Sequence, residues 1–242
     1  MTDAPNPDDV PSVLESRFES PAALAAALAE SVAGDLRKAI DLRGSASLVV
    51  SGGSTPLPFF QALSRQLLPW SKVWITLADE RWVDSDDDAS NHRFVAETLL
   101  QGEATEAVFV PLKNDAASPA QGADAAARAL RPVPRPFDIV VLGMGTDGHI
   151  ASLFPGAPGV EEGLDPQGGR VVVAVDPPTA AHPRLSLGLA ALLDSRRIVL
   201  HITGEDKWQV YRRALGHGPV AELPVRGVLG RGREPIDVYW AP

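Results

Sequence analysis

Short runs of consecutive apolar residues recur along this chain, and most are followed by a polar turn and a segment typical of a helix. Such runs are typical of strands that are buried on both faces of a parallel sheet. We expect strands at Ala46–Val50, Val73–Ala78, Val108–Leu112, Phe137–Leu142, Val171–Val175, Arg184–Leu187, Arg197–Ile202 and Ile236–Trp240. We expect helices at Pro21–Gly44, Pro56–Leu68, Asn91–Leu100, Pro119–Leu130, Gly188–Leu193 and Glu205–Leu215. The alternation predicts an α/β fold with a mainly parallel sheet covered by helices on both faces.

The domain organisation follows from length and composition. The chain has 242 residues, of which 45% are hydrophobic, and it contains neither an internal repeat nor a linker long enough to separate domains. We therefore expect a single α/β domain over residues 12–242. Residues 1–11 are polar, acidic and proline-containing, which predicts a disordered tail. They lack the basic-then-apolar order of a signal peptide, and we expect a cytoplasmic protein.

The charge and the residue counts exclude several classes of function. A formal net charge of −9 argues against general binding to nucleic acids or anionic membranes. No apolar run approaches the roughly 20 residues that span a bilayer. The absence of cysteine excludes thiol nucleophiles and zinc–thiolate sites, and no two histidines have metal-ligand spacing, so we expect no metal. An anionic substrate would need a local positive pocket within this acidic molecule.

The segment FDIVVLGMGTDGHIASLFPG, residues 137–156, carries the strongest functional signal. An apolar strand ends at a turn that contains Gly143, Gly145 and Gly148, and these glycines let the backbone approach a ligand closely. His149 follows directly, where an α/β sheet binds its ligands, and imidazole is the usual group for proton transfer near neutral pH. Asp147 lies two residues earlier. The turn is therefore a candidate catalytic site.

The same turn fits the dinucleotide fingerprint G-x-G-x-x-G, which is the alternative interpretation. That fingerprint requires a long helix directly after the glycines. Pro155 and Gly156 limit any helix after His149 to about two turns, and the glycines and prolines before Val171 exclude a crossover helix. The sequence therefore argues against a nucleotide cofactor.

Three further loops follow predicted strands and offer groups for an anion. Ser51, Gly52, Gly53, Ser54 and Thr55 form a glycine-containing loop, in which Thr55 is expected to cap the next helix and to leave its N–H groups free for a phosphate. The alternative is a tight, well-capped turn with nothing bound.

The other two loops carry charges. Asp79, Glu80 and Arg81 form either a solvated salt bridge or a site in which Arg81 binds a phosphate or an oxyanion. Asn91 is expected to cap its helix and also to touch the ligand. Lys207 belongs to the third loop, Thr203–Lys207, and is a candidate anion ligand. Arg184 is a further candidate, and for both residues the alternative is a surface position. His201 is expected to be a core or face residue of a strand.

Together these segments resemble the 6-phosphogluconolactonase family, which is related to glucosamine-6-phosphate deaminases. The resemblance rests on SGGSTP at residues 51–56, DERWV at 79–83, SN at 90–91, GMGTDGHIASLFPG at 143–156, PRLSL at 183–187 and GEDKW at 204–208. The end of the long motif, SLFPG, is similar to lactonases and lacks the Phe-Asn-Glu-Pro type sequence of deaminases. Asp84 replaces a proline that commonly follows DERWV, and RLSL replaces RITL, which puts loop shape in question more than activity.

The resemblance implies a modified Rossmann-like fold and hydrolysis of 6-phospho-D-glucono-1,5-lactone to 6-phosphogluconate in the oxidative pentose phosphate pathway. In this hypothesis His149 is the general base that takes a proton from water, Asp147 orients the loop or the imidazole, and Arg81 stabilises negative charge on either the oxyanion or the phosphate. The remaining site residues would bind the sugar phosphate: Ser51, Gly52, Gly53, Ser54, Thr55, Asp79, Asn91, Gly145, Arg184 and Lys207. A δ-lactone is reactive, so no metal, cofactor or covalent nucleophile is needed. Separately, we expect a monomer.

Two other functions stay open. One is a sugar-phosphate isomerase or deaminase, which would release ammonia from glucosamine 6-phosphate. The other is a sugar-phosphate sensor without catalytic activity. Such sensors usually accompany a DNA-binding module, and the residues before Ala46 hold only one predicted helix and an acidic segment.

Overall fold

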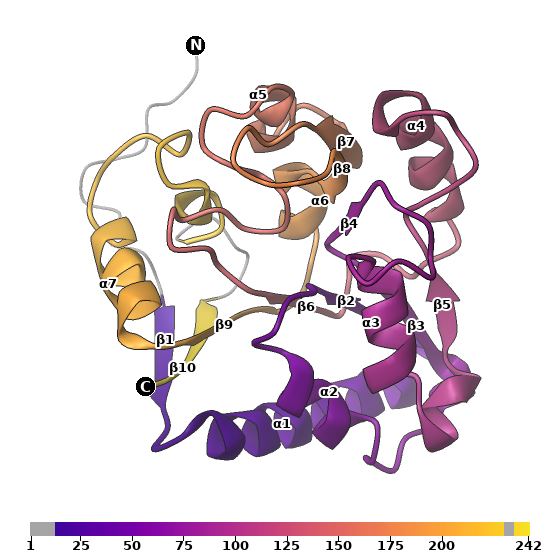
Figure 1. The fold of residues 1–242 in the computed structure, drawn as a ribbon. Helices are drawn as coiled ribbons and strands as arrows, with labels where there is room; N and C mark the ends of the chain where they lie inside the picture. Colours follow the sequence, from indigo (N-terminus) through magenta and orange to yellow (C-terminus); the bar gives the residue numbers. More distant parts are fainter. Residues whose placement is uncertain (1–12, 230–234) are drawn as a thin grey trace.

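The computed structural model describes residues 13–229 and 235–242. A seven-stranded parallel sheet runs through the centre in the order β1-β10-β9-β6-β2-β3-β5 (Figure 1). Its strands are β1 (Val13–Arg17), β2 (Ala46–Val50), β3 (Val73–Leu77), β5 (Val108–Val110), β6 (Ile139–Leu142), β9 (Ile198–Thr203) and β10 (Ile236–Ala241). A mainly parallel sheet is what the sequence predicts.

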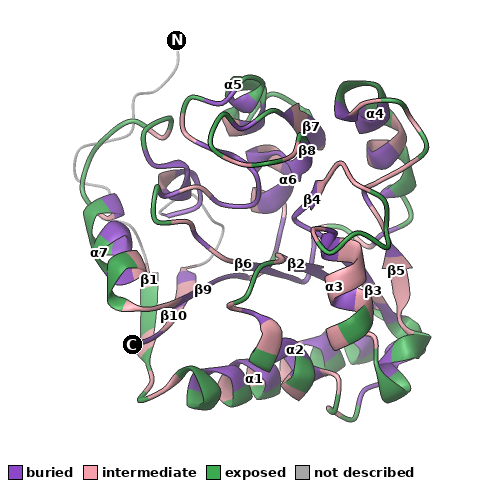
Figure 2. Ribbon diagram, in the orientation of Figure 1, coloured by how far each residue is buried: buried purple, intermediate pink, exposed green. Residues whose placement is uncertain are grey.

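The central strands are the most apolar ones. Every residue of β2 and of β6 is buried, whereas the edge strand β1 is partly exposed along its length. The purple ribbon in the middle of Figure 2 marks this burial. Buried apolar residues from the central sheet and from the helices on both of its faces belong to one hydrophobic cluster. The division into a tail at 1–11 and one domain at 12–242 stays a prediction, and residues 1–12 lie outside the described residues.

Helices cover both faces of the central sheet (Figure 1). One face carries α1 (Pro21–Arg43) and α2 (Leu57–Leu63), and α6 (Leu189–Leu193) lies on the other side, with α5 (Val160–Leu164) beyond it next to residues 172–175. The remaining helices are α3 (Asn91–Thr98), α4 (Pro119–Ala129) and α7 (Glu205–Ala214), with 3-10 turns at Trp70–Lys72, Gly102–Glu106 and Pro224–Gly227. Within the described residues, no helix is both long and apolar enough to cross a bilayer.

The ends of α1 illustrate how local sequence sets an element. The Ser20 hydroxyl accepts a hydrogen bond from the Ala23 N–H at 3.2 Å, and Pro21 occupies the first helical position. Gly44 ends the helix at φ 82°, and its N–H donates to the Ile40 carbonyl at 2.8 Å. Both ends therefore lie where the sequence predicts them.

A second, antiparallel sheet was not predicted. It has the order β4-β8-β7, from β4 (Asp79–Arg81), β8 (Arg184–Leu187) and β7 (Val172–Val175). The two latter strands were expected, but not their separate antiparallel sheet. The chain leaves the main sheet at Ala78, whose N–H donates to Val50 and whose carbonyl accepts from Leu187, each at 2.8 Å. One residue thus connects the two sheets.

Several boundaries differ from the expectation. The helix expected at Pro56–Leu68 is only Leu57–Leu63, and the strand expected at Val108–Leu112 ends at Val110. β1, β4 and α5 were not predicted from the sequence.

Candidate active site

A cavity of about 250 Å³ opens at the carboxyl ends of the central strands. It brings together loops that follow β2, β3, β6 and β9, which parallel strands direct to one edge of the sheet. Twelve of the predicted site residues line it: Ser51, Gly52, Gly53, Ser54, Thr55, Asp79, Arg81, Asn91, Gly145, His149, Arg184 and Lys207. Asp147 does not line the cavity, but it contacts His149. The predicted convergence of distant loops is therefore present.

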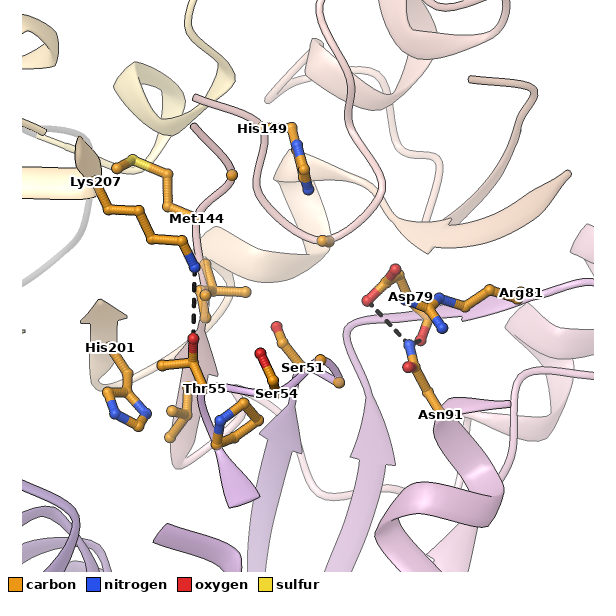
Figure 3. A pocket seen from close by; sticks show the side chains of 18 of the residues that line it. Ser51, Ser54, Thr55, Asp79, Arg81, Asn91, Met144, His149, His201 and Lys207 are labelled. Carbon is orange, nitrogen blue, oxygen red and sulfur yellow. Dashed lines mark hydrogen bonds between the residues drawn. The ribbon is translucent and has the colours of Figure 1, made fainter. Parts of the chain in front are cut away.

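In the turn at residues 143–149, here called the histidine turn, Asp147 contacts one edge of the His149 imidazole. Nδ1 of His149 lies 2.5 Å from Oδ1 of Asp147, which also accepts the His149 backbone N–H at 3.1 Å. A carboxylate on Nδ1 selects the tautomer with its proton there and leaves Nε2 free to accept another. Partial burial raises the pKa of Asp147, but hydrogen bonds and charge from His149 outweigh it and hold that pKa below its usual range. Figure 3 shows the imidazole pointing into the pocket.

Two glycines make this turn possible. Gly148 adopts φ 81°, and its carbonyl accepts the Val225 N–H at 2.9 Å. At Gly145 a Cβ would overlap both the His149 ring and the Asp147 carboxylate. The Gly145 N–H donates to the His149 carbonyl at 3.0 Å. The absence of a Cβ at Gly145 therefore leaves the space that the Asp147 carboxylate and the His149 imidazole occupy.

Opposite lies a wall of carboxylate, amide and guanidinium groups (Figure 3). Oδ2 of Asp79 accepts the Ser152 hydroxyl at 2.5 Å and lies 3.7 Å from Nη1 of Arg184. Nδ2 of Asn91 donates to the Asp79 carbonyl at 2.9 Å. Nη1 of Arg81 donates to the Ala89 carbonyl at 2.6 Å. This wall is prearranged by the protein's own contacts.

Three polar atoms of the pocket residues are buried without a partner in the part of the chain that the structure describes. They are the Ser51 hydroxyl and the Nε atoms of Arg81 and Arg184. A buried donor without an acceptor costs about 1–3 kcal/mol. Burial lowers the pKa of Arg184, Asp79 opposes the shift and Arg81 adds to it, yet a guanidinium stays charged. These donors are suited to an anionic or oxygen-rich ligand.

Glu80 serves a structural role, not the solvated salt bridge that was one of the expectations. Its carboxylate is 1% exposed and accepts the N–H groups of Asn91 and His92, each at 2.8 Å. Burial raises the pKa of Glu80 in spite of these hydrogen bonds. The helix cap is Ser90, whose hydroxyl accepts the Arg93 N–H at 3.2 Å, and Asn91 is the first helical residue. The expectation that Asn91 caps α3 is wrong, and its amide is free to hold Asp79.

Thr55 also differs from its expected role, because it does not cap α2. The residue before that helix is Pro56, which makes no side-chain cap, and α2 has only seven residues. Oγ1 of Thr55 instead accepts Nζ of Lys207 at 3.4 Å (Figure 3). Burial lowers the pKa of Lys207. The Ser51–Thr55 loop therefore contacts a cation from the first turn of α7, which supplies the local positive charge that an anionic substrate needs.

Sequence reasoning missed several residues of the site. His201, expected in the core or on a strand face, is 3% exposed and still lines the cavity. Burial, with a smaller contribution from the charge of Lys207, lowers the pKa of His201 to about 4. Ser152 and Phe154 stand behind the cavity and contact Asp79 and His149. Both residues lie in the long motif at residues 143–156, but the motif alone does not show which residues they contact.

Comparisons with known proteins decide the family. A family model described as "Glucosamine-6-phosphate isomerases/6-phosphogluconolactonase" matches residues 19–240. A protein of Rhizobium meliloti named 6-phosphogluconolactonase is 49% identical over 225 residues, which are 93% of this chain and 97% of that protein. This chain belongs to the glucosamine-6-phosphate isomerase/6-phosphogluconolactonase family. The relative of that name in Pseudomonas aeruginosa is 43% identical and is covered to 92%, as is this chain.

Solved structures of the family share the fold. A 6-phosphogluconolactonase from Shewanella baltica superposes with a TM-score of 0.93 at 49% identity, over 96% of this chain and 99% of that one. A monomeric glucosamine-6-phosphate deaminase has a TM-score of 0.77 at 19% identity, covering 94% and 96% of the two chains, and that likeness concerns the fold alone. The modified Rossmann-like fold that the resemblance implied is confirmed for this family member.

Proposed function

We propose that this protein hydrolyses 6-phospho-D-glucono-1,5-lactone to 6-phosphogluconate, a step of the oxidative pentose phosphate pathway. The geometry that supports this most directly is an acid-oriented imidazole, His149, in the same cavity as Arg81, Arg184 and Lys207. A phosphorylated lactone needs both groups, a base at its carbonyl carbon and cations for its phosphate and its oxyanion. Relatives at 49% and 47% identity bear the name 6-phosphogluconolactonase.

In the proposed mechanism, Nε2 of His149 takes a proton from water as the water oxygen bonds to the lactone carbonyl carbon. The carbonyl π electrons move to the oxygen, which becomes the oxyanion of a tetrahedral intermediate. When the oxyanion re-forms the carbonyl, the ring C–O bond breaks and the imidazolium returns its proton to the leaving ring oxygen. One water is consumed, and no covalent enzyme intermediate forms. General base catalysis of this kind contributes about 10²–10⁴-fold.

In this proposal, two groups of cations bind different parts of the substrate. Lys207 with Thr55 and the rest of the Ser51–Thr55 loop binds the phosphate. Arg81 and Arg184, which line the cavity on the wall with Asp79, would stabilise the oxyanion. The resemblance implied that Arg184 binds the phosphate, but its contact with Phe154, which stacks on His149, favours the reacting end of the substrate. Asp79 and Asn91 would bind ring hydroxyls.

The test follows lactone loss in a solution where the lactone is generated enzymatically from glucose 6-phosphate. Product formation above the spontaneous rate, lost in His149→Ala, supports the proposal. Wild-type protein that leaves the rate at the spontaneous value contradicts it. Glucosamine 6-phosphate with ammonia detection tests the deaminase alternative, for which release of ammonia is required. The SLFPG ending at residues 152–156 favours the lactonase.

Finer expectations belong to the same proposal. We propose that the protein acts as a monomer in the cytoplasm, without binding nucleic acid, which its net charge of −9 supports. Light scattering after size exclusion tests the monomer, since a mass near twice 25.6 kDa would contradict it.

A further inference from the structure

Phe154 contacts both the imidazole of His149 and the guanidinium of Arg184. Its ring stacks on His149 with a centroid distance of 4.0 Å and an interplanar angle of 26°. The guanidinium carbon of Arg184 is 5.4 Å from the same ring centroid. Phe154 is 7% exposed. A buried aromatic ring therefore contacts both the proposed base and a proposed oxyanion-binding group.

The segment that carries Phe154 is anchored on the opposite wall. The Ser152 N–H donates to the Ser186 hydroxyl at 3.1 Å, and its own hydroxyl donates to Asp79 at 2.5 Å. Nη1 of Arg184 lies 3.5 Å from the same hydroxyl. Between His149 and Ser152, Ala151 adopts φ 48°, a left-handed conformation that is uncommon for a residue with a Cβ. The chain thus turns sharply from the histidine to a fixed anchor, and Phe154 follows two residues later.

The contacts of His149 explain what a ring at this place can do. Asp147 holds one edge of the imidazole, and the His149 side chain is 27% exposed, so that contact does not by itself fix the plane of the ring. A stacked aromatic face does fix it. The π face also attracts the positive charge that the imidazole gains when it takes a proton, as it attracts the nearby guanidinium of Arg184.

We propose that Phe154 is a positioning residue, which fixes the plane of the His149 imidazole through its stacked ring. This inference rests on the proposed function, because the positioned group is the proposed base. Phe154 itself touches no reacting atom in this account. Its loss should therefore lower the rate of the chemical step and leave substrate affinity nearly unchanged.

The test compares Phe154→Leu with Phe154→Tyr and a matched control. Phe154→Leu should lower kcat about tenfold with KM within twofold of wild type, because an oriented catalytic group is lost but no ligand contact. Phe154→Tyr keeps the aromatic face and should restore kcat to within about threefold. The control is Phe137→Leu. Phe137 is fully buried and carries Arg135 over its ring at 4.2 Å, but it lies at the other end of the β6 region and does not line the cavity.

Phe137→Leu should keep the wild-type kcat whatever it does to stability. The inference is overturned if Phe154→Leu keeps kcat within twofold, if only its KM changes, or if Phe137→Leu lowers kcat equally.

A measurement without substrate separates this inference from the proposed function. The ring current of Phe154 shields the His149 Cε1 proton in an NMR spectrum, and that signal is identified by its loss in His149→Gln. It should move downfield in Phe154→Leu and stay near its place in Phe154→Tyr. An unchanged signal in Phe154→Leu overturns the positioning role even if the protein is a lactonase. A shifted signal in a protein without lactonase activity would contradict the proposed function and leave the positioning intact.

Discussion

Arg81 and Arg184 are register partners in the antiparallel pair β4–β8, and each has a buried Nε atom without a partner among the described residues. Like charges directly opposite each other on neighbouring strands are destabilising. Asp79 lies 3.7 Å from Arg184, and the charge of Glu80 also acts on Arg184. Both arginines line the cavity, where an anion would offset their mutual repulsion.

Ligand binding should stabilise the folded protein through this pair. At about 100 times its Kd, 6-phosphogluconate should stabilise the native state by about 2.7 kcal/mol and raise Tm by roughly 5 °C or more. Arg184→Met should lose most of that increase at the same ligand concentration. Thermal unfolding with and without ligand measures it, and Arg212→Met, whose side chain is 53% exposed on α7, is the control. An equal rise in Tm in Arg184→Met would remove Arg184 from the binding site.

Lys207 should determine selectivity for the phosphate. A hydrogen bond to a charged group contributes about 1.5–3 kcal/mol, so Lys207→Met should raise KM for the phosphorylated lactone about 10- to 100-fold. The unphosphorylated glucono-1,5-lactone lacks the group that Lys207 would bind, and its hydrolysis should change little. Steady-state kinetics with both lactones makes the comparison. A similar loss for both substrates would show that Lys207 does not act on the phosphate.

Gly145→Ala should disable the histidine turn. The new Cβ would overlap the His149 ring and the Asp147 carboxylate, so the imidazole must leave its place. We expect kcat to fall about 100-fold, since misplacement of a catalytic group by about 1 Å costs that much. Gly34→Ala in α1, where a Cβ meets nothing within 4 Å, is the control and should keep its activity. Normal kcat in Gly145→Ala would contradict the tight packing of this turn.

His201 should make stability depend on pH. Its pKa is about 4 in the folded protein and about 6.5 when unfolded, so between these values the unfolded chain binds more protons. Stability therefore falls as pH drops from 6.5 towards 4, and His201 should contribute a loss of about 2 kcal/mol between pH 7 and pH 5. Urea unfolding of wild type and His201→Leu at both pH values measures the difference. An equal pH dependence in the two proteins would show that His201 titrates normally.

The convergence of the site was predictable because it follows from strand direction. Apolar runs such as Ala46–Val50 identified buried parallel strands, and such strands bring their following loops to one edge. Polar residues that follow the predicted strands were therefore the candidates for the site. His149, Arg81 and Lys207 were predicted to share one site for this reason.

The remainder depends on partners far along the chain. Asp79–Arg81 is a strand despite its three charged residues. Ser152, Arg184 and Asn91 contact Asp79, and two of these lie 73 or more positions away. Thr55 has the local sequence of a helix cap, but its hydroxyl accepts a hydrogen bond from Lys207, which lies 152 positions away. β1 reads VLESR, and its partly exposed edge position gives no apolar pattern to recognise. Local patterns contain none of these contacts.

His149 is the proposed base that activates water in this cavity. The most direct test of this role is kcat for 6-phosphogluconolactone hydrolysis by His149→Asn, together with calorimetric binding of 6-phosphogluconate to confirm an intact pocket. The account predicts a fall in kcat of about 10²–10⁴-fold with product affinity retained. Activity within a few-fold of wild type, with the product still bound, would contradict it.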